Sequence, residues 1–424
     1  MSNPKHTRPK GTQDFVPPRA EQKSKVEDVF RHLAERFGFQ EIVIPTFEYT
    51  DVFVKSSGTG SDIVTKEMYT FKDRADRSLT LRPEGTGGVV RAVLENRLRI
   101  PCRLYYLGPY FRYGRPQKGR FREFFQLGVE ALGEASPLVD AETILFGDEF
   151  FRELGISDCI TRLNSIGCRN CRPAYQHKLV EFLSSHKDRL CSECQLRLKH
   201  NPLRVFDCKQ EQCQAVLKDA PKPGDYLCPE CSRHFKAVQA SLDKQGLRYE
   251  LNGRLVRGLD YYNRTTFEFV SSKLGAQDSI GGGGRYDYLV EDFGGPQTPA
   301  IGLAIGLERT MLAMGEKEQA RRRLAFVVWM GDAELDEAQK VLARLRAQGI
   351  PAQMDYDAHR MKHQFKSADA AGASCCVIIG ADELAKGVYS LKDLTTGRQI
   401  QVPVSELIGT VQKLIRAQSV ATRR

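Results

Sequence analysis

The sequence lacks the long apolar segments that mark membrane and secreted proteins. No apolar run approaches the roughly 20 residues needed to span a bilayer. Residues 1–6 contain no hydrophobic core of a signal peptide. The pattern therefore predicts a cytoplasmic protein.

Two common nucleotide-binding signatures are also missing. The chain has no GxGxxG, which disfavours a Rossmann dinucleotide site. Residues 114–120 have the glycine spacing of a Walker A loop but neither its Lys-Ser/Thr ending nor a helix start. Any phosphate chemistry must therefore rely on arginine side chains, and three stand in otherwise apolar surroundings: Arg112, Arg257 and Arg309. For any one of them, an ion pair with a glutamate is an equally good explanation.

The composition is that of a globular protein with a basic surface. The 424 residues allow two or three domains, and 41% of them are hydrophobic and 27% charged. The net charge of +10 favours a polyanionic partner, of which nucleic acid is the commonest. A surface that is merely basic is the alternative.

Eight of the twelve cysteines are concentrated between residues 168 and 231. Paired CxxC spacing of this kind is typical of structural zinc sites, and eight thiols would fill two four-cysteine sites. The spacing does not fix the pairing, and reduced thiols without metal are the alternative. The eight candidate ligands are Cys168, Cys171, Cys191, Cys194, Cys208, Cys213, Cys228 and Cys231.

Periodicity predicts the main elements along the chain. Residues 19–37 have the pattern of an amphipathic helix, and residues 103–106 and 122–131 form a predicted strand hairpin. Residues 168–251 are helical, charged and cysteine-rich, which indicates an insertion. We expect residues 300–313 to form an apolar helix. From residue 324 strands alternate with helices, which predicts a compact α/β unit.

The segment Arg257–Tyr262 places an arginine, a carboxylate and two phenols on a turn before a predicted strand. Such a segment can present a fixed positive charge to a phosphate and hydrogen-bond donors to a small polar ligand. It resembles the histidine-binding motif of histidyl-tRNA synthetases. The resemblance extends along almost the whole chain through motifs in the order typical of class II aminoacyl-tRNA synthetases: Lys10–Asp14, Arg82–Thr86, Phe111–Arg112, Phe125–Glu130, Gly281–Asp287, Gly302–Arg309 and Leu391–Leu394.

The resemblance implies an α+β fold and a two-domain organisation. Residues 1–322 would form a catalytic domain built on an antiparallel sheet, with residues 168–251 as the helical insertion. Residues 323–424 would form an anticodon-binding domain. Residues 41–45 resemble the end of the motif that forms the dimer interface in this class, which implies a homodimer.

The resemblance also assigns the histidine-binding residues. Glutamate and neutral donors suit a zwitterionic amino acid, and an imidazole needs partners for two nitrogens. Mutual satisfaction of Glu130 and Tyr262 in a core is the alternative. The residues implied for histidine binding are Glu84, Gly85, Thr86, Gln126, Glu130, Arg257, Tyr261, Tyr262 and Tyr286.

In the implied reaction, histidine and ATP form histidyl-adenylate and pyrophosphate, and histidine is then transferred to histidine tRNA. Arg257, Arg112 and Gln126 would be catalytic, and Arg112, Glu123 and Arg309 would bind ATP, which carries Mg²⁺ on its phosphates. Arg115 and Gln117 would meet the tRNA acceptor stem. The competing interpretation is a non-catalytic synthetase-like regulatory subunit of ATP phosphoribosyltransferase.

Overall fold

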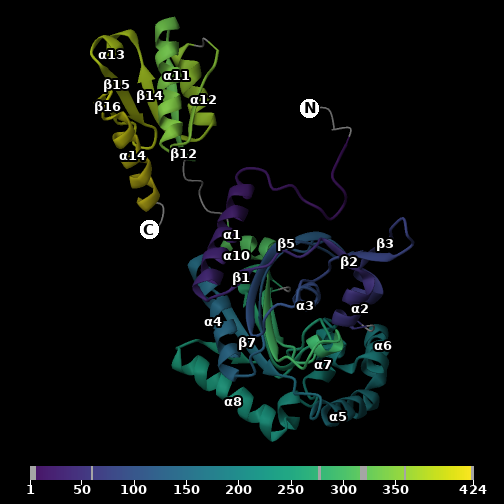
Figure 1. Cartoon of the computed structure of the whole chain (residues 1–424). Coiled ribbons are helices and arrows are strands. Elements are labelled where there is room, and N and C mark those ends of the chain that lie inside the picture. Colours follow the sequence, from purple (N-terminus) through teal and green to yellow (C-terminus); the bar gives the residue numbers. More distant parts are fainter. Residues whose placement is uncertain (1–5, 59–60, 276–277, 316–321, 358–359, 422–424) are drawn as a thin grey trace. The chain divides into compact units, whose positions relative to one another are not determined.

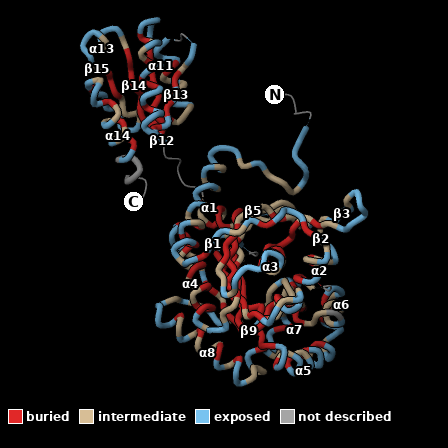
Figure 2. The backbone as a smooth tube through the Cα atoms, viewed as in Figure 1, coloured by how far each residue is buried: buried red, intermediate tan, exposed pale blue. Residues whose placement is uncertain are grey.

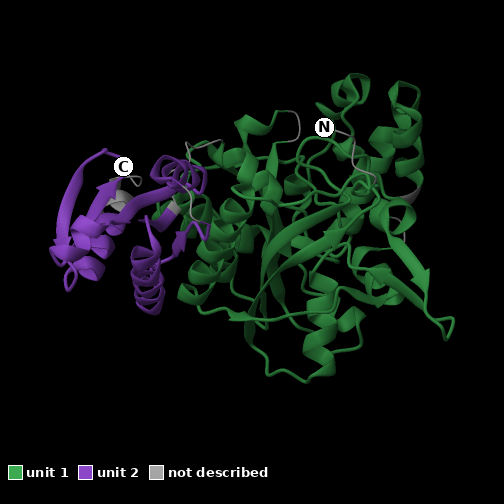
Figure 3. Cartoon of the chain, turned by 90° about the horizontal axis from the view of Figure 1, so that it is seen from above, with its two compact units in different colours: residues 1–316 green, residues 317–424 purple. Residues whose placement is uncertain are grey.

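A computed structural model describes residues 6–58, 61–275, 278–315, 322–357 and 360–421. The chain divides into two compact units, residues 1–316 and 317–424, which Figure 3 colours separately. Each unit has a sheet and a hydrophobic core of its own.

An eight-stranded sheet forms the centre of the first unit (Figure 1). Its middle strands pair antiparallel, and a parallel pair closes each edge. The strand order is β1-β5-β6-β11-β10-β9-β7-β8. The bounds are β1 (Gln40–Glu41), β5 (Cys102–Phe111), β6 (Glu123–Leu132), β7 (Cys159–Ser165), β8 (Tyr249–Leu251), β9 (Asn263–Ser271), β10 (Ser279–Arg285) and β11 (Ala300–Gly306).

The predicted helix over residues 300–313 is wrong in its first half. Residues 300–306 form strand β11, and helix α10 begins only at Leu307 and ends at Met314. β11 is paired on both edges, with β6 and with β10, and five of its seven residues are buried. A strand covered on both faces has a continuous apolar sequence, which periodicity does not distinguish from a buried helix.

The predicted hairpin is confirmed in a longer form. β5 and β6 pair antiparallel over their whole length, from Cys102 opposite Leu132 to Phe111 opposite Glu123. β5 therefore runs through Gly108 and Pro109 and does not stop before them. β1, by contrast, is short and ends at Glu41.

Helices cover the two faces of the large sheet, and Figure 2 shows the buried strands between them. On one face, α1 (Arg19–Arg36) and α4 (Pro137–Glu153) meet through aromatic edges, with the ring of Phe30 5.4 Å from Phe146 and 5.5 Å from Phe150. On the other face, α3 (Thr86–Glu95) packs its valines with Leu104 and Tyr106 of β5. The candidate site lies on this second side.

Shorter elements surround the large sheet. A three-stranded sheet has the order β2-β4-β3. The bounds are β2 (Phe47–Tyr49), α2 (Thr50–Ser57), the π-helix η1 (Ile63–Glu67), β3 (Tyr69–Lys72), β4 (Ser78–Leu81), the 3₁₀ turn η5 (Ser272–Leu274) and α9 (Leu289–Asp292).

The cysteine-rich insertion is helical, as predicted, and has a small core of its own around Leu179, Leu183 and Val205. Its elements are α5 (Arg172–Ser185), η2 (Lys187–Arg189), α6 (Ser192–His200), η3 (Pro202–Asp207), α7 (Glu211–Leu217), η4 (Pro223–Tyr226) and α8 (Pro229–Lys244).

The second unit is the predicted α/β arrangement with an additional hairpin. Its sheet has the order β13-β12-β14-β15-β16, and the antiparallel pair β15–β16 was not predicted. The bounds are β12 (Arg322–Trp329), α11 (Asp332–Ala347), β13 (Ala352–Met354), α12 (Met361–Ala370), β14 (Ala373–Ile379), α13 (Ala381–Ala385), β15 (Val388–Asp393), β16 (Gln399–Pro403) and α14 (Leu407–Ala421). The basic residues Arg360, Lys362, His363 and Lys366 lie on or directly before α12, and the neighbouring His359 lies outside the described residues. None of the helices in the described ranges combines the length and the apolar character that a bilayer crossing requires.

Candidate active site

A buried carboxylate, Glu130 on β6, is the centre of the site. It accepts hydrogen bonds from the hydroxyls of Thr86 (2.7 Å), Tyr286 (2.6 Å) and Tyr106 (3.2 Å). Burial raises the pKa of Glu130 to about 8, although the bonds from Tyr286 and Thr86 favour the charged form. The hydrogen-bond partners of Glu130 are thus neutral hydroxyls, and a positively charged or proton-donating ligand would suit it.

A second carboxylate, Glu84, lies just before helix α3. It accepts a bond from the Ser56 hydroxyl (2.7 Å) and one from the Gly87 amide (3.0 Å) at the start of that helix. Burial raises the pKa of Glu84, while these donors and the charge of Arg112 act against the rise. A pair of buried carboxylates at one site, one at a helix N-terminus, fits a ligand that carries an ammonium group.

Three tyrosines enclose the space near Glu130. The rings of Tyr261 and Tyr262 are 4.5 Å apart, and that of Tyr286 is 5.5 Å from Tyr261. The Tyr261 hydroxyl donates to Thr86 Oγ1 at 3.2 Å. The hydroxyls that bond Glu130 come from Thr86, Tyr106 and Tyr286, so the alternative in which Tyr262 satisfies Glu130 is not what the structure shows.

Two glycines allow these side chains to lie flat on the sheet. A Cβ at Gly302 would lie 1.8 Å from a Glu130 carboxylate oxygen, and one at Gly282 would lie 2.8 Å from Arg257 Nη1. Neither distance is compatible with a side chain, so glycine is required at both positions. The glycine run of β10 and the glycines of β11 thus form the floor of the site.

Arg112 lies where β5 ends, with its guanidinium 5.3 Å from the Phe124 ring. Its Nε donates to the Pro83 carbonyl at 2.8 Å, and in the described part of the chain it makes no ion pair. Burial lowers the pKa of Arg112, against the attraction of Glu67 and Glu84. A half-buried cation of this kind calls for an anionic ligand.

The other two arginines have protein partners. Arg257 Nη1 donates to Glu268 at 2.8 Å, and its Nε is buried without a partner in the described residues. Burial acts to lower the pKa of Arg257, but Glu268 and nearby phenols outweigh it. Arg309, on α10, donates to the carbonyls of Gly119 (3.0 Å) and Ser279 (2.7 Å). The ion-pair alternative therefore holds for Arg257, which pairs with Glu268.

The remaining predicted residues of the hairpin occupy different positions. Strand alternation places Gln126 on the same face of β6 as Glu130, and Glu123 on the opposite face. Arg115 and Gln117 are exposed at the hairpin tip. The tip is anchored below, where Arg120 bonds Glu67 at 2.5 Å.

The insertion supplies contacts that sequence reasoning missed. Arg172 donates to the Tyr262 carbonyl at 2.8 Å, Asn201 to Asp260 at 2.8 Å, and Arg204 to the Arg257 carbonyl at 3.4 Å. These residues carried no signal, because polar side chains on short helices are ordinary surface residues until the fold brings them to the site. Tyr106 could have been found from the sequence. A glycine in the middle of a strand, here Gly128, indicates that a large side chain lies close to it, and Tyr106 is opposite Gly128 on the neighbouring strand.

The eight predicted cysteines form two groups of four. We call Cys168, Cys171, Cys228 and Cys231 the first thiol cluster, and Cys191, Cys194, Cys208 and Cys213 the second; within each, the sulfur atoms all lie within 4.8 Å of one another. Sulfur separations of 3.7, 3.8 and 4.0 Å occur in the first cluster and 3.8 Å in the second. Four sulfurs around zinc at about 2.3 Å would lie roughly 3.8 Å apart at the corners of a tetrahedron. Both clusters therefore fit Zn²⁺. The sequence left the pairing open, and in the structure the second cluster lies, along the chain, between the two halves of the first.

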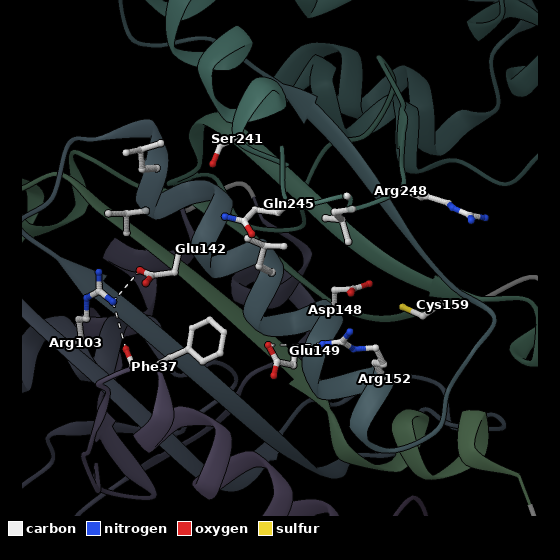
Figure 4. Close-up of a pocket in the computed structure, with 15 residues that line it drawn as sticks. Phe37, Arg103, Glu142, Asp148, Glu149, Arg152, Cys159, Ser241, Gln245 and Arg248 are labelled. Atoms are coloured by element: carbon white, nitrogen blue, oxygen red, sulfur yellow. Dashed lines mark hydrogen bonds and ion pairs between the residues drawn. The ribbon is translucent and has the colours of Figure 1, made fainter. Parts of the chain in front are cut away.

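A groove on helix α4, shown in Figure 4, lies elsewhere in the first unit. None of its fifteen lining residues belongs to the predicted site. Its one thiol, Cys159, is held neutral because burial raises its pKa to about 12. No chemistry is assigned to this groove.

Comparison with known families assigns both units. A family model described as histidyl-tRNA synthetase matches residues 11–310, and one described as anticodon binding domain matches residues 324–414. The chain is 46% identical to histidine–tRNA ligase of Desulfitobacterium hafniense over 413 residues, covering 96% of this chain and 97% of that protein. It is also 46% identical to histidine–tRNA ligase of Halothermothrix orenii over 414 residues, covering 96% and 99%.

Solved structures show the same fold. Apo S. aureus histidyl-tRNA synthetase superposes with a TM-score of 0.78 at 34% identity, covering 96% of this chain and 99% of that chain. A Bacillus halodurans protein titled as ATP phosphoribosyltransferase regulatory subunit/histidyl-tRNA synthetase gives a TM-score of 0.63 at 20% identity, covering 89% of this chain and 99% of that one. This second likeness shows the fold alone.

Proposed function

The chain belongs to the histidyl-tRNA synthetase family and has the activity of a class II histidine–tRNA ligase, and from this premise we propose how its site carries out the reaction. Histidine and ATP form histidyl-adenylate and pyrophosphate, and the histidyl group then passes to the terminal adenosine of tRNA. The observation that carries the proposal is the buried Glu130 carboxylate, surrounded by hydroxyl donors.

Histidine is recognised by its two polar ends. The imidazole meets Glu130 and Tyr262, and the enclosing rings of Tyr261 and Tyr286 exclude water. Because burial raises the pKa of Glu130 to about 8, one proton is shared between this carboxyl and the imidazole near neutral pH. Glu84, Gly85, Thr86 and Gln126 would hold the ammonium and carboxylate groups at the start of α3 and on β6. An apolar amino acid would offer the Glu130 carboxyl neither a positive charge nor a further hydrogen-bond partner, and would be rejected.

The three arginines bind the phosphates of ATP. Arg112, which makes no ion pair in the described part of the chain, and Arg257, whose Nε is buried without a partner there, would grip the α-phosphate. Arg309 would serve the γ-phosphate, and Glu123 would contribute to ATP binding. Positive charge and alignment, more than a general base, lower the barrier for attack by the histidine carboxylate. Mg²⁺ would arrive bound to the ATP phosphates.

Transfer RNA would meet the chain at two places. The exposed hairpin tip with Arg115 and Gln117 would contact the acceptor stem. The second unit, which the sequence predicted as an anticodon-binding domain over residues 323–424, would read the anticodon. Its match to the anticodon-binding model over residues 324–414 supports this role. The net charge of +10 supports a polyanionic partner.

A homodimer is supported by exposed apolar side chains on the three-stranded sheet and in the segment before it. Val43 is 85% exposed, and the rings of Phe47 and Phe71 are in contact at 6.3 Å while both remain about half exposed. Such a patch is typical of an interface. Val43 lies within residues 41–45, the predicted interface motif.

Zinc is proposed as the structural cofactor of the insertion. The sulfur separations in both thiol clusters match a tetrahedral site, and four thiolates leave no open position for catalysis. Reduced thiols persist in the cytoplasm, where tRNA and ATP are also present, and we place the enzyme there.

Histidine binding measured by titration calorimetry tests the pocket. Glu130→Gln keeps the size of the side chain but removes the carboxylate, and we expect its histidine affinity to fall about 100-fold or more, because hydrogen bonds to charged groups are worth about 1.5–3 kcal/mol each. Glu211→Gln on exposed α7 is the matched control. Unchanged affinity in Glu130→Gln would contradict the assignment of the imidazole site.

A further inference from the structure

We propose that the second thiol cluster is a zinc site that positions the Arg257–Tyr262 segment for histidine activation. The proposal rests on the role assigned above to that segment, and it adds a positioning function for the insertion. Cys191, Cys194, Cys208 and Cys213 are the ligands, and Asn201 and Arg204 transmit their geometry to the site.

The cluster closes the two ends of one short segment. Helix α6 starts directly after Cys191 and contains Cys194, while η3 ends directly before Cys208. Cys191 and Cys208 bring their sulfurs to 3.8 Å across the segment, and the Cys191 amide donates to Cys213 Sγ at 3.2 Å. A zinc ion at this point would hold residues 195–207 as a closed loop with fixed ends. We refer to residues 195–207 as the zinc-clamped loop.

The middle of the zinc-clamped loop holds the histidine-binding segment. Asn201 donates to the Asp260 carboxylate at 2.8 Å, and Arg204 donates to the Arg257 carbonyl at 3.4 Å. Asp260 is largely buried, and burial raises its pKa against the charges of Arg204 and Arg172. Without the Asn201 amide, this carboxylate would lose its donor, and the turn that carries Arg257 and Tyr262 would lose its anchor.

The same loop also holds Asp62, the residue directly before η1. Arg204 and Arg197 both pair with Asp62, at 3.4 and 3.3 Å, immediately before η1. η1 in turn contains Glu67, which bonds Arg120 below the hairpin tip. The Arg197 guanidinium also donates to the Arg204 carbonyl at 3.2 Å, which stiffens the loop internally. One clamped loop thus contacts both the histidine-binding segment and the start of η1.

A hydrophobic core alone would not fix this loop. Leu203, Val205 and Phe206 are its buried apolar side chains, and its helical elements α6 and η3 have only nine and six residues. The insertion is a small structure, and small structures depend on metals or cross-links for a fixed shape. A displacement of the order of 1 Å at a reacting group is enough to cost about 10²-fold in rate.

The experiment uses the full chain, purified with its zinc and assayed by histidine-dependent exchange of pyrophosphate into ATP. Metal content is measured by mass spectrometry on the same samples. We expect two zinc ions per wild-type chain and one in Cys208→Ser, with the KM for histidine raised about tenfold or more in that variant. Cys102→Ser, a cysteine outside both clusters, should keep two zinc ions and the wild-type KM.

Asn201→Asp separates positioning from folding. It leaves all eight thiols in place but sets a second carboxylate against Asp260. We expect two zinc ions, an unchanged melting temperature and a KM for histidine raised about tenfold or more, with the KM for ATP changed less than about threefold. A loss of folded enzyme would instead lower kcat and leave both KM values unchanged. Gln399→Glu, the same amide-to-carboxylate change at an exposed position of the second unit, is the control.

Two results would overturn the proposal. One is a wild-type chain without zinc, or with the same zinc content as Cys208→Ser. The other is Asn201→Asp with full zinc content and a wild-type KM for histidine. Arg257→Ala tests the proposed function separately. Normal exchange in this variant would refute the role of the Arg257–Tyr262 segment in histidine activation, whereas it would say nothing against the zinc-clamped loop.

Discussion

At the scale of single residues, the site depends on ionisable groups placed where water is excluded. Glu130 has neutral hydroxyl partners, and Arg112 has a carbonyl partner and no ion pair within the described ranges. Such groups are costly in the empty protein and are stabilised when a ligand supplies the opposite charge. These groups therefore lower the stability of the ligand-free protein and favour the binding of a ligand.

Glu130 should therefore leave a signature in the pH dependence of stability. The folded protein keeps the Glu130 proton up to about pH 8, whereas the unfolded chain releases it near 4.5. Between these values the folded state binds more protons, so the unfolding free energy falls as pH rises, by up to about 1.4 kcal/mol per pH unit. In Glu130→Gln the side chain does not titrate, so this contribution to the fall in unfolding free energy is absent.

Denaturant unfolding of the ligand-free protein between about pH 5.5 and about pH 7.5 measures the effect. We expect the stability of Glu130→Gln relative to wild type to increase steadily across this range. The exposed-residue control Glu211→Gln should follow the wild type. Parallel pH dependences of Glu130→Gln and wild type would mean that Glu130 is not held protonated.

At the scale of elements, the sequence predicted the hairpin, helix α1 and the α/β unit, because the apolar and polar residues of these elements alternate with the period of the element they form. Helix α4 was not predicted. The central strand β11 was predicted as a helix because it is buried on both faces and shows no alternation. The contacts of Asn201 and Arg204 could not be predicted either. They depend on how the insertion folds back onto residues 257–262, and the sequence holds no local pattern for that.

The floor strand β10 provides the element-scale prediction. Gly282→Ala would place a methyl group 2.7 Å from the Phe267 carbonyl oxygen and 2.8 Å from Arg257 Nη1, and it should lower histidine-dependent exchange by about 10²-fold through displacement of the strand and of that guanidinium. Gly281→Ala, on the neighbouring position of the same strand, meets Ile305 at 3.0 Å and no residue of the site. It is the matched control.

Exchange rates of the two glycine variants are compared per folded molecule, with folding followed by thermal melting. Equal losses in Gly281→Ala and Gly282→Ala would show that the strand matters for packing only. A selective loss in Gly282→Ala would support the close approach of Arg257 to the sheet.

At the scale of the whole molecule, the order of motifs along the chain identified the family, although each motif alone is short. The structure brings Arg82–Thr86, β6, β10 and the Arg257–Tyr262 segment to one face of the sheet, which no single motif specifies. The pairing of the eight cysteines is also a property of the whole fold. Nested pairing joins residues 60 positions apart, and the sequence left it open.

Amino-acid-dependent exchange of pyrophosphate into ATP tests the central claim most directly, with each of the twenty amino acids offered in turn. The account predicts exchange with histidine alone in the wild-type chain, and a rate about 10²–10³-fold lower in Arg112→Met, because that variant lacks the guanidinium that stabilises charge on the α-phosphate. Exchange with no amino acid, or wild-type exchange in Arg112→Met, would contradict the assignment of this site to histidine activation.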